Sequence, residues 1–222
     1  LEKIKASAKD RIFENKKTVA EDMAAILFTS GSTGIPKGVV YTHANFTAQH
    51  KALKNLYNIQ KGEIDLATFP LFALFAPALG MTSIIPKMNF TRPGLVNSKT
   101  IIDAVNDYQC TMMFGSPALL NRVGKWGEAN EKKLPTLKRV LSAGAPVSAT
   151  VLKRFISLLN NDVQIFTPYG ATESLPVSSV GTNVILNETA KATSAGKGVC
   201  VGTPVSCIDT RIIKITDDVI TT

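Results

Sequence analysis

The most informative part of this sequence reads, in order, Thr29, Ser30, Gly31, Ser32, Thr33, Gly34, Ile35, Pro36, Lys37 and Gly38. Its three glycines allow the backbone to approach an anion closely, its four hydroxyls can donate hydrogen bonds, and its lysine adds a positive charge. It is not a Walker loop, because Pro36 precedes Lys37 and Gly38 follows it. A plain Gly/Ser turn is the alternative, but the density of glycines and hydroxyls favours a phosphate-binding loop.

Short apolar runs alternate with helix-like segments around this loop. The run Ala24–Thr29 predicts a buried strand before it, and the segment from Thr42 or His43 to Tyr57 predicts a helix after it. Further strands are expected at Glu63–Thr68, Cys110–Phe114, Arg139–Ser142 and Val163–Phe166, and further helices at Lys99–Tyr108, Pro117–Lys125 and Ser148–Leu159. This order predicts an α/β fold with parallel or mixed sheets and flanking helices, in which ligands bind at the carboxyl ends of the strands.

The C-terminal tail differs in composition from the rest of the chain. From Val199 onward it is rich in β-branched residues such as Val205, Ile208 and Ile213, which is typical of strands. We therefore expect residues 1–198 to belong to the α/β domain and residues 199–222 to begin a β-rich subdomain.

Length and composition limit the class of protein. With 222 residues, 45% of them hydrophobic, the chain can bury a core in one or two domains, so disorder is excluded. The three cysteines lack CxxC spacing, which excludes a disulfide scaffold or a four-thiolate zinc site and favours a reducing compartment. The segment Leu1–Lys17 does not resemble an export signal, so a cytoplasmic location is expected. Prolines interrupt the longest apolar stretch, Phe69–Leu79, and no membrane span is expected.

The net charge of +8 raises the question of a nucleic-acid partner. The densest basic patch is diluted by Glu128 and Glu131 and lacks an interleaved aromatic ladder for base stacking. A solvated surface is therefore favoured, and no nucleic-acid partner is expected. The patch comprises Arg122, Lys125, Lys132, Lys133, Lys138 and Arg139.

Two further motifs follow predicted strands. Residues Ser142–Pro146 read Ser-Ala-Gly-Ala-Pro, and residues Tyr169–Ser174 read Tyr-Gly-Ala-Thr-Glu-Ser. Both are expected at the same sheet edge as residues 29–38. In sequence and order, the three motifs resemble those of the adenylate-forming superfamily, which includes acyl-CoA synthetases, luciferases and the adenylation domains of peptide synthetases. The resemblance covers nearly the whole chain from the first predicted strand onward, and it implies part of the large N-terminal α/β domain of these enzymes.

The resemblance implies ATP and Mg²⁺ as cofactors and assigns roles to individual residues. Lys37, Thr172 and Glu173 would be catalytic, with Thr172 donating to the α-phosphate and Glu173 binding Mg²⁺. Taken alone, Tyr169 would be a core or rim residue, Thr172 a turn or helix-capping residue, and Glu173 a surface residue. The residues implied to bind the nucleotide and its phosphates are Thr29, Ser30, Gly31, Ser32, Thr33, Gly34, Lys37, Gly144, Ala145, Pro146, Tyr169, Gly170, Ala171 and Thr172.

The implied chemistry is attack by a substrate carboxylate on the α-phosphorus of ATP, which releases pyrophosphate and leaves an acyl-adenylate. The carboxylate is already ionised near neutral pH, so no general base is required. Charge stabilisation and alignment are needed instead, which fits a set of hydrogen-bond donors, a lysine and a metal ligand.

One segment indicates the branch of the superfamily. Residues Phe69–Gly80 occupy the place of the acyl-pocket motif, where many acyl-CoA synthetases carry a histidine at the position of Ala73. The sequences of this segment and of Gly198–Val205 most resemble those of the β-lactone synthetases of bacterial olefin biosynthesis. That branch implies a long-chain β-hydroxy acid whose own hydroxyl captures the adenylate. The alternatives are a fatty acyl-CoA ligase, which would use coenzyme A, and a peptide-synthetase adenylation domain.

Three residues are expected to line the acyl pocket by motif position, namely Phe72, Phe114 and Gly115; plain core packing is the alternative for each. The superfamily pattern places further large-domain sequence before Leu1 and a lysine-bearing C-terminal subdomain after Thr222. We therefore expect the chain to be a fragment that does not turn over by itself and that depends on the rest of its polypeptide. A nucleotide-binding module without catalysis is the non-enzymatic alternative.

Overall fold

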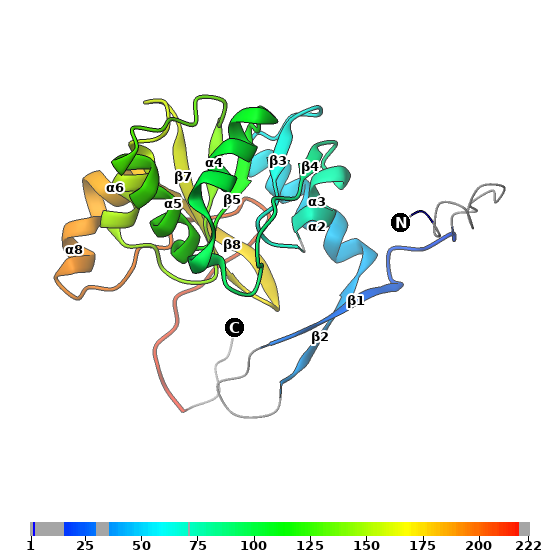
Figure 1. Ribbon diagram of the computed structural model, residues 1–222. Helices are drawn as coiled ribbons and strands as arrows, with labels where there is room; N and C mark the ends of the chain where they lie inside the picture. The colour runs from blue at the N-terminus through cyan, green and yellow to red at the C-terminus, as the bar shows by residue number, and fades with distance from the viewer. Residues whose placement is uncertain (1, 3–15, 30–35, 71, 218–222) are drawn as a thin grey trace. The chain divides into compact units, whose positions relative to one another are not determined.

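The computed structural model describes residues 2, 16–29, 36–70 and 72–217 (Figure 1). Contacts between residues divide the chain into two compact units, residues 1–47 and residues 48–222, and each is described by itself.

In the first unit, two strands form a hairpin. β1 (Met23–Phe28) pairs antiparallel with β2 (Gly38–Thr42) in a two-stranded sheet of their own. The prediction that this first strand is buried is wrong, because Met23 is 61% exposed and Phe28 is 70% exposed. A short continuous apolar run does not reveal its partner, so a hairpin arm and a fully buried parallel strand look alike in sequence.

The helix predicted after the loop is confirmed as α2 (His43–Leu56). The Asn45 N–H donates to the Thr42 hydroxyl over 3.3 Å, which satisfies one of the free amide groups at the start of the helix. Thr42 therefore caps the start of α2.

The second unit is built on a seven-stranded sheet in the order β4-β3-β5-β6-β7-β8-β9. The strands from β4 to β7 run parallel, and β8 and β9 add to the β7 edge in antiparallel orientation. This mixed sheet confirms the predicted α/β class. The strands are β3 (Ile64–Leu66), β4 (Thr82–Ile84), β5 (Met112–Phe114), β6 (Arg139–Leu141), β7 (Gln164–Ala171), β8 (Ser174–Gly181) and β9 (Thr203–Pro204).

Helical segments connect these strands, and three of them begin with a side-chain cap. Asn97, Ser116 and Ser148 accept hydrogen bonds from the backbone N–H groups of Lys99, Leu119 and Val151 at the starts of α4, α5 and α6. The segments are α3 (Phe72–Ala78), the 3₁₀ turn η1 (Pro93–Leu95), α4 (Ser98–Asp107), α5 (Pro117–Ala129), α6 (Ala149–Ile156), α7 (Thr182–Val184), the π-helical η2 (Ile185–Thr189) and α8 (Ala190–Ser194).

The two faces of the sheet carry separate cores. Leu66, Met113, Val140 and Ile165 lie in register on neighbouring strands and pack with residues of α4, α5 and α6. Side chains alternate along a strand, so the residues between them face the other side. There Met112 and Leu141 belong to a smaller cluster that includes Tyr57, Ile59, Ala76, Leu79 and Met81.

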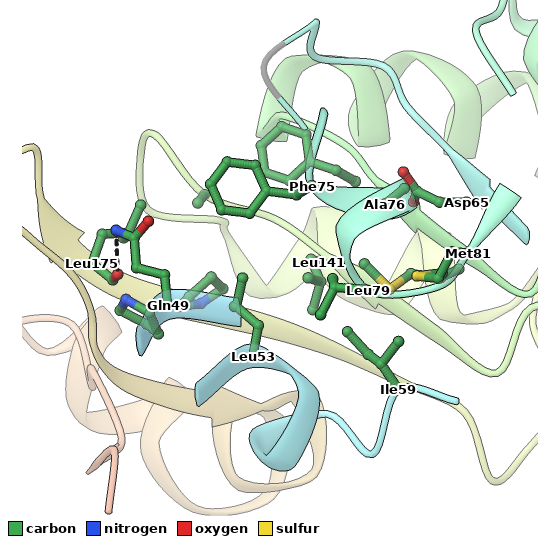
Figure 2. Close-up of a pocket in the computed structure, with 15 residues that line it drawn as sticks. Gln49, Leu53, Ile59, Asp65, Phe75, Ala76, Leu79, Met81, Leu141 and Leu175 are labelled. Carbon is green, nitrogen blue, oxygen red and sulfur yellow. Dashed lines mark hydrogen bonds between the residues drawn. The ribbon is translucent and has the colours of Figure 1, made fainter. Parts of the chain in front are cut away.

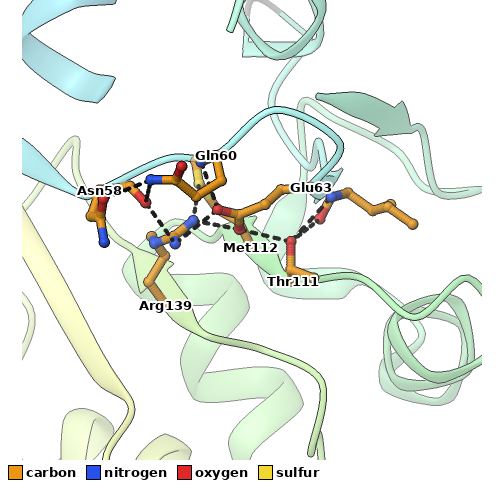
Figure 3. A network of polar contacts seen from close by, with 7 residues as sticks. Asn58, Gln60, Glu63, Thr111, Met112 and Arg139 are labelled. Carbon is orange, nitrogen blue, oxygen red and sulfur yellow. Dashed lines mark hydrogen bonds and ion pairs between the residues drawn. The ribbon is translucent and has the colours of Figure 1, made fainter. Parts of the chain in front are cut away.

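A buried ion pair joins the start of β3 to β6 (Figure 3). The Arg139 guanidinium donates to both carboxylate oxygens of Glu63, over 2.7 and 3.0 Å, and the Thr111 hydroxyl donates to the same carboxylate. Burial raises the pKa of Glu63, but these hydrogen bonds and that from the Gln60 N–H more than offset it, so the pKa lies below its usual value. The assignment of Arg139 to a solvated basic patch is therefore wrong, since the alternation of β6 turns it inward and Glu63 neutralises it.

The C-terminal tail departs from the strand-rich expectation. Within the described residues beyond Val199, β9 is the only strand, and Ile212 and Ile215 are fully exposed. β-branched residues favour strands only where a neighbouring strand pairs with them, and none does so along residues 205–217. The division at residue 198 stays a prediction, as do the cytoplasmic location and the lack of a nucleic-acid partner. No helix in the described part of the chain is long and apolar enough to cross a membrane.

Candidate functional site

A cavity of about 650 Å³ lies at the carboxyl ends of β6 and β7. One wall is the loop after β6, which supplies the predicted residues Gly144, Ala145 and Pro146. Gly144 has φ of +91°, a conformation that side chains rarely adopt, so the sharp turn of this loop requires glycine. The opposite walls come from β7, from η2 and α8, and from residues 199–201.

Tyr169 and Gly170 lie in β7 and line the same cavity. The Tyr169 side chain is 53% exposed, which leaves its ring free to stack on a planar ligand. A Cβ on Gly170 would approach the Ser174 carbonyl oxygen to 2.5 Å, so glycine is required where β7 turns toward β8. The structure therefore brings together the second and third sequence motifs, as expected from their positions after neighbouring parallel strands.

Ser142 adds a polar atom that the sequence did not single out. It is fully buried, lines the 650 Å³ cavity, and its hydroxyl has no hydrogen-bond partner within the described part of the chain. A buried hydroxyl without a partner is unfavourable, which indicates a hydrogen-bonding group on the occupant of the cavity.

The remaining residues of the third motif lie beside the cavity rather than in its lining. Ala171 ends β7, and Thr172 and Glu173 form the turn before β8, with Glu173 exposed. Among the residues described, no group of three or more His, Cys, Asp or Glu side chains could hold a metal ion. Glu173 could therefore hold Mg²⁺ only together with ligand phosphates, which is how proteins commonly bind this ion.

The phosphate-loop motif belongs to the first unit. The Thr29 N–H donates to the Lys37 carbonyl oxygen over 2.9 Å and closes the base of the loop, and Lys37 is exposed. Ser30, Gly31, Ser32, Thr33 and Gly34 lie outside the described residues. The expectation that this loop follows a strand of the same sheet as the other two motifs is wrong, because within the described residues β1 pairs only with β2, in a sheet separate from theirs.

A second, apolar cavity of about 80 Å³ adjoins the first (Figure 2). Ala143 and Pro168 line both cavities, which shows that the two are neighbours. Phe114 lines the apolar one. Gly115 lines neither and packs instead against Leu120 of α5. Phe72 begins α3, and its side chain lies outside the described part of the structure.

Asp65 is a site residue that the sequence analysis missed. It lines the apolar cavity from the middle of β3, is 2% exposed, and burial raises its pKa to about 7. Burial and the charge of Asp65 together raise the pKa of Cys110 to about 12. The available signal was an aspartate between two apolar residues, Ile64 and Leu66, in a predicted strand.

Comparison with known proteins identifies the family. The sequence profile of the AMP-binding enzyme family matches residues 1–220. The chain belongs to this family. The resemblance inferred from the three motifs is thereby confirmed, because the adenylate-forming enzymes are those that share the AMP-binding fold.

Two relatives in the AMP-binding family are olefin β-lactone synthetases. The chain is 48% identical over 200 residues to that of Xanthomonas campestris and 51% identical over 200 residues to that of Stenotrophomonas maltophilia. Each match covers 90% of this chain but 35% of the relative, so the chain spans about a third of their length.

A solved structure supports the fold. O-succinylbenzoate coenzyme A synthetase from Bacillus subtilis, in complex with AMP, superposes with a TM-score of 0.67 and 20% sequence identity. The match covers 85% of this chain and 36% of that chain. The chain thus shares its fold with part of that enzyme.

Proposed function

We propose that the full-length protein containing this chain uses ATP to activate a long-chain β-hydroxy carboxylic acid and converts the resulting acyl-adenylate into a β-lactone. The observation that carries this proposal is a large cavity with several hydroxyl-bearing wall residues adjoining a smaller apolar one, in a chain about half identical to two olefin β-lactone synthetases. The larger cavity suits a nucleotide, and the apolar one suits the alkyl part of an acid.

The larger cavity would hold adenosine. Tyr169 would stack on the adenine, and the loop at Gly144–Pro146 would contact the opposite side of the base. The free Ser142 hydroxyl supports this assignment, because adenine offers both hydrogen-bond donors and acceptors.

The phosphates would be held by the first motif and by the end of the third. Lys37 and the hydroxyl-rich loop at residues 29–34 would bind the β and γ phosphates, and Thr172 would donate to the α-phosphate. Mg²⁺, bound by Glu173 and phosphate oxygens, would neutralise charge on the leaving pyrophosphate. The substrate carboxylate would form a bond to the α-phosphorus as the bond to the pyrophosphate oxygen breaks.

In the second step, the β-hydroxyl oxygen would attack the adenylate carbonyl, AMP would leave, and the hydroxyl proton would pass to solvent. This route needs no coenzyme A. It is favoured over thioester formation by Ala73, since many acyl-CoA synthetases carry a histidine there, and by the identity to the β-lactone synthetases.

The test uses the full-length protein with ATP, Mg²⁺ and a long-chain β-hydroxy acid, with and without coenzyme A. We expect pyrophosphate release and a product mass equal to the acid minus water, independent of coenzyme A. Lys37→Met should reduce pyrophosphate release strongly, whereas Lys138→Met, at an exposed lysine outside both cavities, should leave it unchanged. A thioester formed only with coenzyme A would make the protein an acyl-CoA ligase, and no pyrophosphate with any carboxylic acid would reject the proposal.

A further inference from the structure

The apolar cavity contains one ionisable side chain among its described lining residues, that of Asp65. The other side chain there with strong hydrogen-bonding groups is Gln49, whose Nε2 donates to the Leu175 carbonyl oxygen over 3.0 Å. In Figure 2, Gln49 and Asp65 lie on opposite sides of the cavity, with Asp65 beside Ala76 and Met81. Asp65 is thus a polar group set among aliphatic and aromatic side chains.

One oxygen of the Asp65 carboxyl is buried without compensation from any described residue. Its Oδ1 atom has no hydrogen-bond partner among the residues that the structure describes, although the residue is 2% exposed. Burying such a group without a partner opposes folding, and an aliphatic residue of similar size would avoid this penalty. Local packing therefore does not explain an aspartate at this position.

The neighbouring strand also carries a buried side-chain polar atom without a hydrogen-bond partner among the described residues. Ser83 on β4 is in register with Asp65 on β3, so both side chains face the same side of the sheet, and the Ser83 hydroxyl also lacks a partner within the described chain. Two unsatisfied polar groups on adjacent strands, one of them lining a cavity, indicate that the cavity receives a ligand with a hydrogen-bonding group of its own.

We infer that Asp65 is a specificity-determining residue that hydrogen-bonds a hydroxyl on the acyl chain of the carboxylic acid substrate. This inference rests on the proposed function and names the part of the substrate that the apolar cavity recognises.

A hydroxyl matches this site better than a charged group does. It donates to an ionised carboxyl and accepts from a protonated one, and both forms are present near neutral pH because burial raises the pKa of Asp65 to about 7. An ammonium group would need several further hydrogen-bond acceptors to be stable in so apolar a cavity, and Asp65 is the one ionisable side chain among the described lining residues.

The test compares two acids that differ only in one hydroxyl, 3-hydroxydecanoate and decanoate, on the full-length protein and its Asp65→Leu and Asp65→Asn variants. We expect Asp65→Leu to lower kcat/KM for pyrophosphate release with 3-hydroxydecanoate by about tenfold to a hundredfold and to leave decanoate unchanged or improved. Asp65→Asn should retain most of the preference, because an amide still hydrogen-bonds a hydroxyl. Leu79→Val, a change to a purely apolar wall residue, should affect both acids alike.

A second readout keeps this inference separate from the proposed function. Calorimetric binding of the two acids without ATP should show the same Asp65-dependent preference. If the protein releases no pyrophosphate but still prefers 3-hydroxydecanoate through Asp65, the proposed function fails and the inference stands. If Asp65→Leu changes the response to both acids equally, or to neither, in both assays, the inference is overturned. Thermal unfolding of each variant checks that its fold is retained.

Discussion

At the level of single residues, Asp65 and Tyr169 are placed against the usual preferences of their side chains. Asp65 is a carboxyl buried in an apolar cavity, and Tyr169 is a large aromatic residue that stays half exposed on a cavity wall. Both placements cost stability that a ligand can restore, because a buried polar group gains a partner and an exposed ring gains a stacking surface.

The raised pKa of Asp65 predicts a pH-dependent stability. Between about pH 4 and pH 7 the unfolded chain loses this proton while the folded chain keeps it, so stability falls as pH rises through that window. Asp65→Asn removes the effect. The difference in free energy of unfolding between this variant and the unsubstituted protein should therefore shift in favour of the variant by about 4 kcal/mol from pH 4 to pH 8.

Chemical denaturation of the full-length protein across this pH range measures the difference. Asp103→Asn is the matched control, because Asp103 is an exposed carboxyl on α4 that pairs with Lys99 at the surface. An equal pH dependence in the Asp65 and Asp103 variants would contradict the prediction.

The proposed stacking role of Tyr169 predicts different effects of two substitutions. Tyr169→Phe keeps the ring and should leave the KM for ATP nearly unchanged, whereas Tyr169→Ala should raise it by about tenfold. Steady-state kinetics with pyrophosphate detection provides the measurement. A similar KM for both variants would show that the ring does not contact the nucleotide.

At the level of elements, similar sequence patterns led to different structures depending on their partners. The helices α2, α4, α5 and α6 were predictable in type and approximate bounds, and α4 and α6 show why, because they have regular apolar faces and capping residues. The short helices α3, α7 and α8 were not predicted. The hairpin of β1 and β2, the antiparallel β8 and the π-helical η2 were not predicted, because pairing and helix type depend on contacts distant in sequence.

Two glycines in α5 provide a matched test of how this helix packs. A Cβ on Gly127 would overlap Leu158 Cδ2, whereas one on Gly124 would meet Arg154 Cγ at an ordinary 3.4 Å. Gly127→Ala should therefore destabilise the protein by about 1–3 kcal/mol. Gly124→Ala should be neutral or stabilise it by up to about 1 kcal/mol through helix propensity. Denaturation midpoints of the two variants test this, and equal shifts would mean that the packing of α5 differs from that described.

At the level of the whole molecule, the larger cavity combines segments distant in sequence. The loop after β6, strand β7, the segment from η2 to α8 and residues 199–201 all contribute to its walls. The nucleotide site proposed there depends on the folded second unit rather than on any single motif.

Cysteine accessibility tests that arrangement. Cys200 lines the larger cavity, whereas Cys207 is exposed outside it. ATP at about ten times its Kd should slow alkylation of Cys200 by N-ethylmaleimide by about tenfold and leave Cys207 unaffected. Mass spectrometry of the labelled full-length protein measures both sites at once. Unchanged labelling of Cys200 at saturating ATP would argue against a nucleotide in this cavity.

The sequence by itself determined the α/β class, the order of most strands and helices and the family, because periodicity, capping residues and contiguous motifs are local features. It also placed the second and third motifs correctly, since they follow neighbouring parallel strands. Only the tertiary structure decided that the strands on either side of the phosphate loop pair in a separate sheet, that Arg139 is buried against Glu63, and that Asp65 lines an apolar cavity with its Oδ1 unpartnered among the described residues. The physical reason is that strand pairing, burial and hydrogen-bond satisfaction depend on residues far apart in the chain, which no local pattern records.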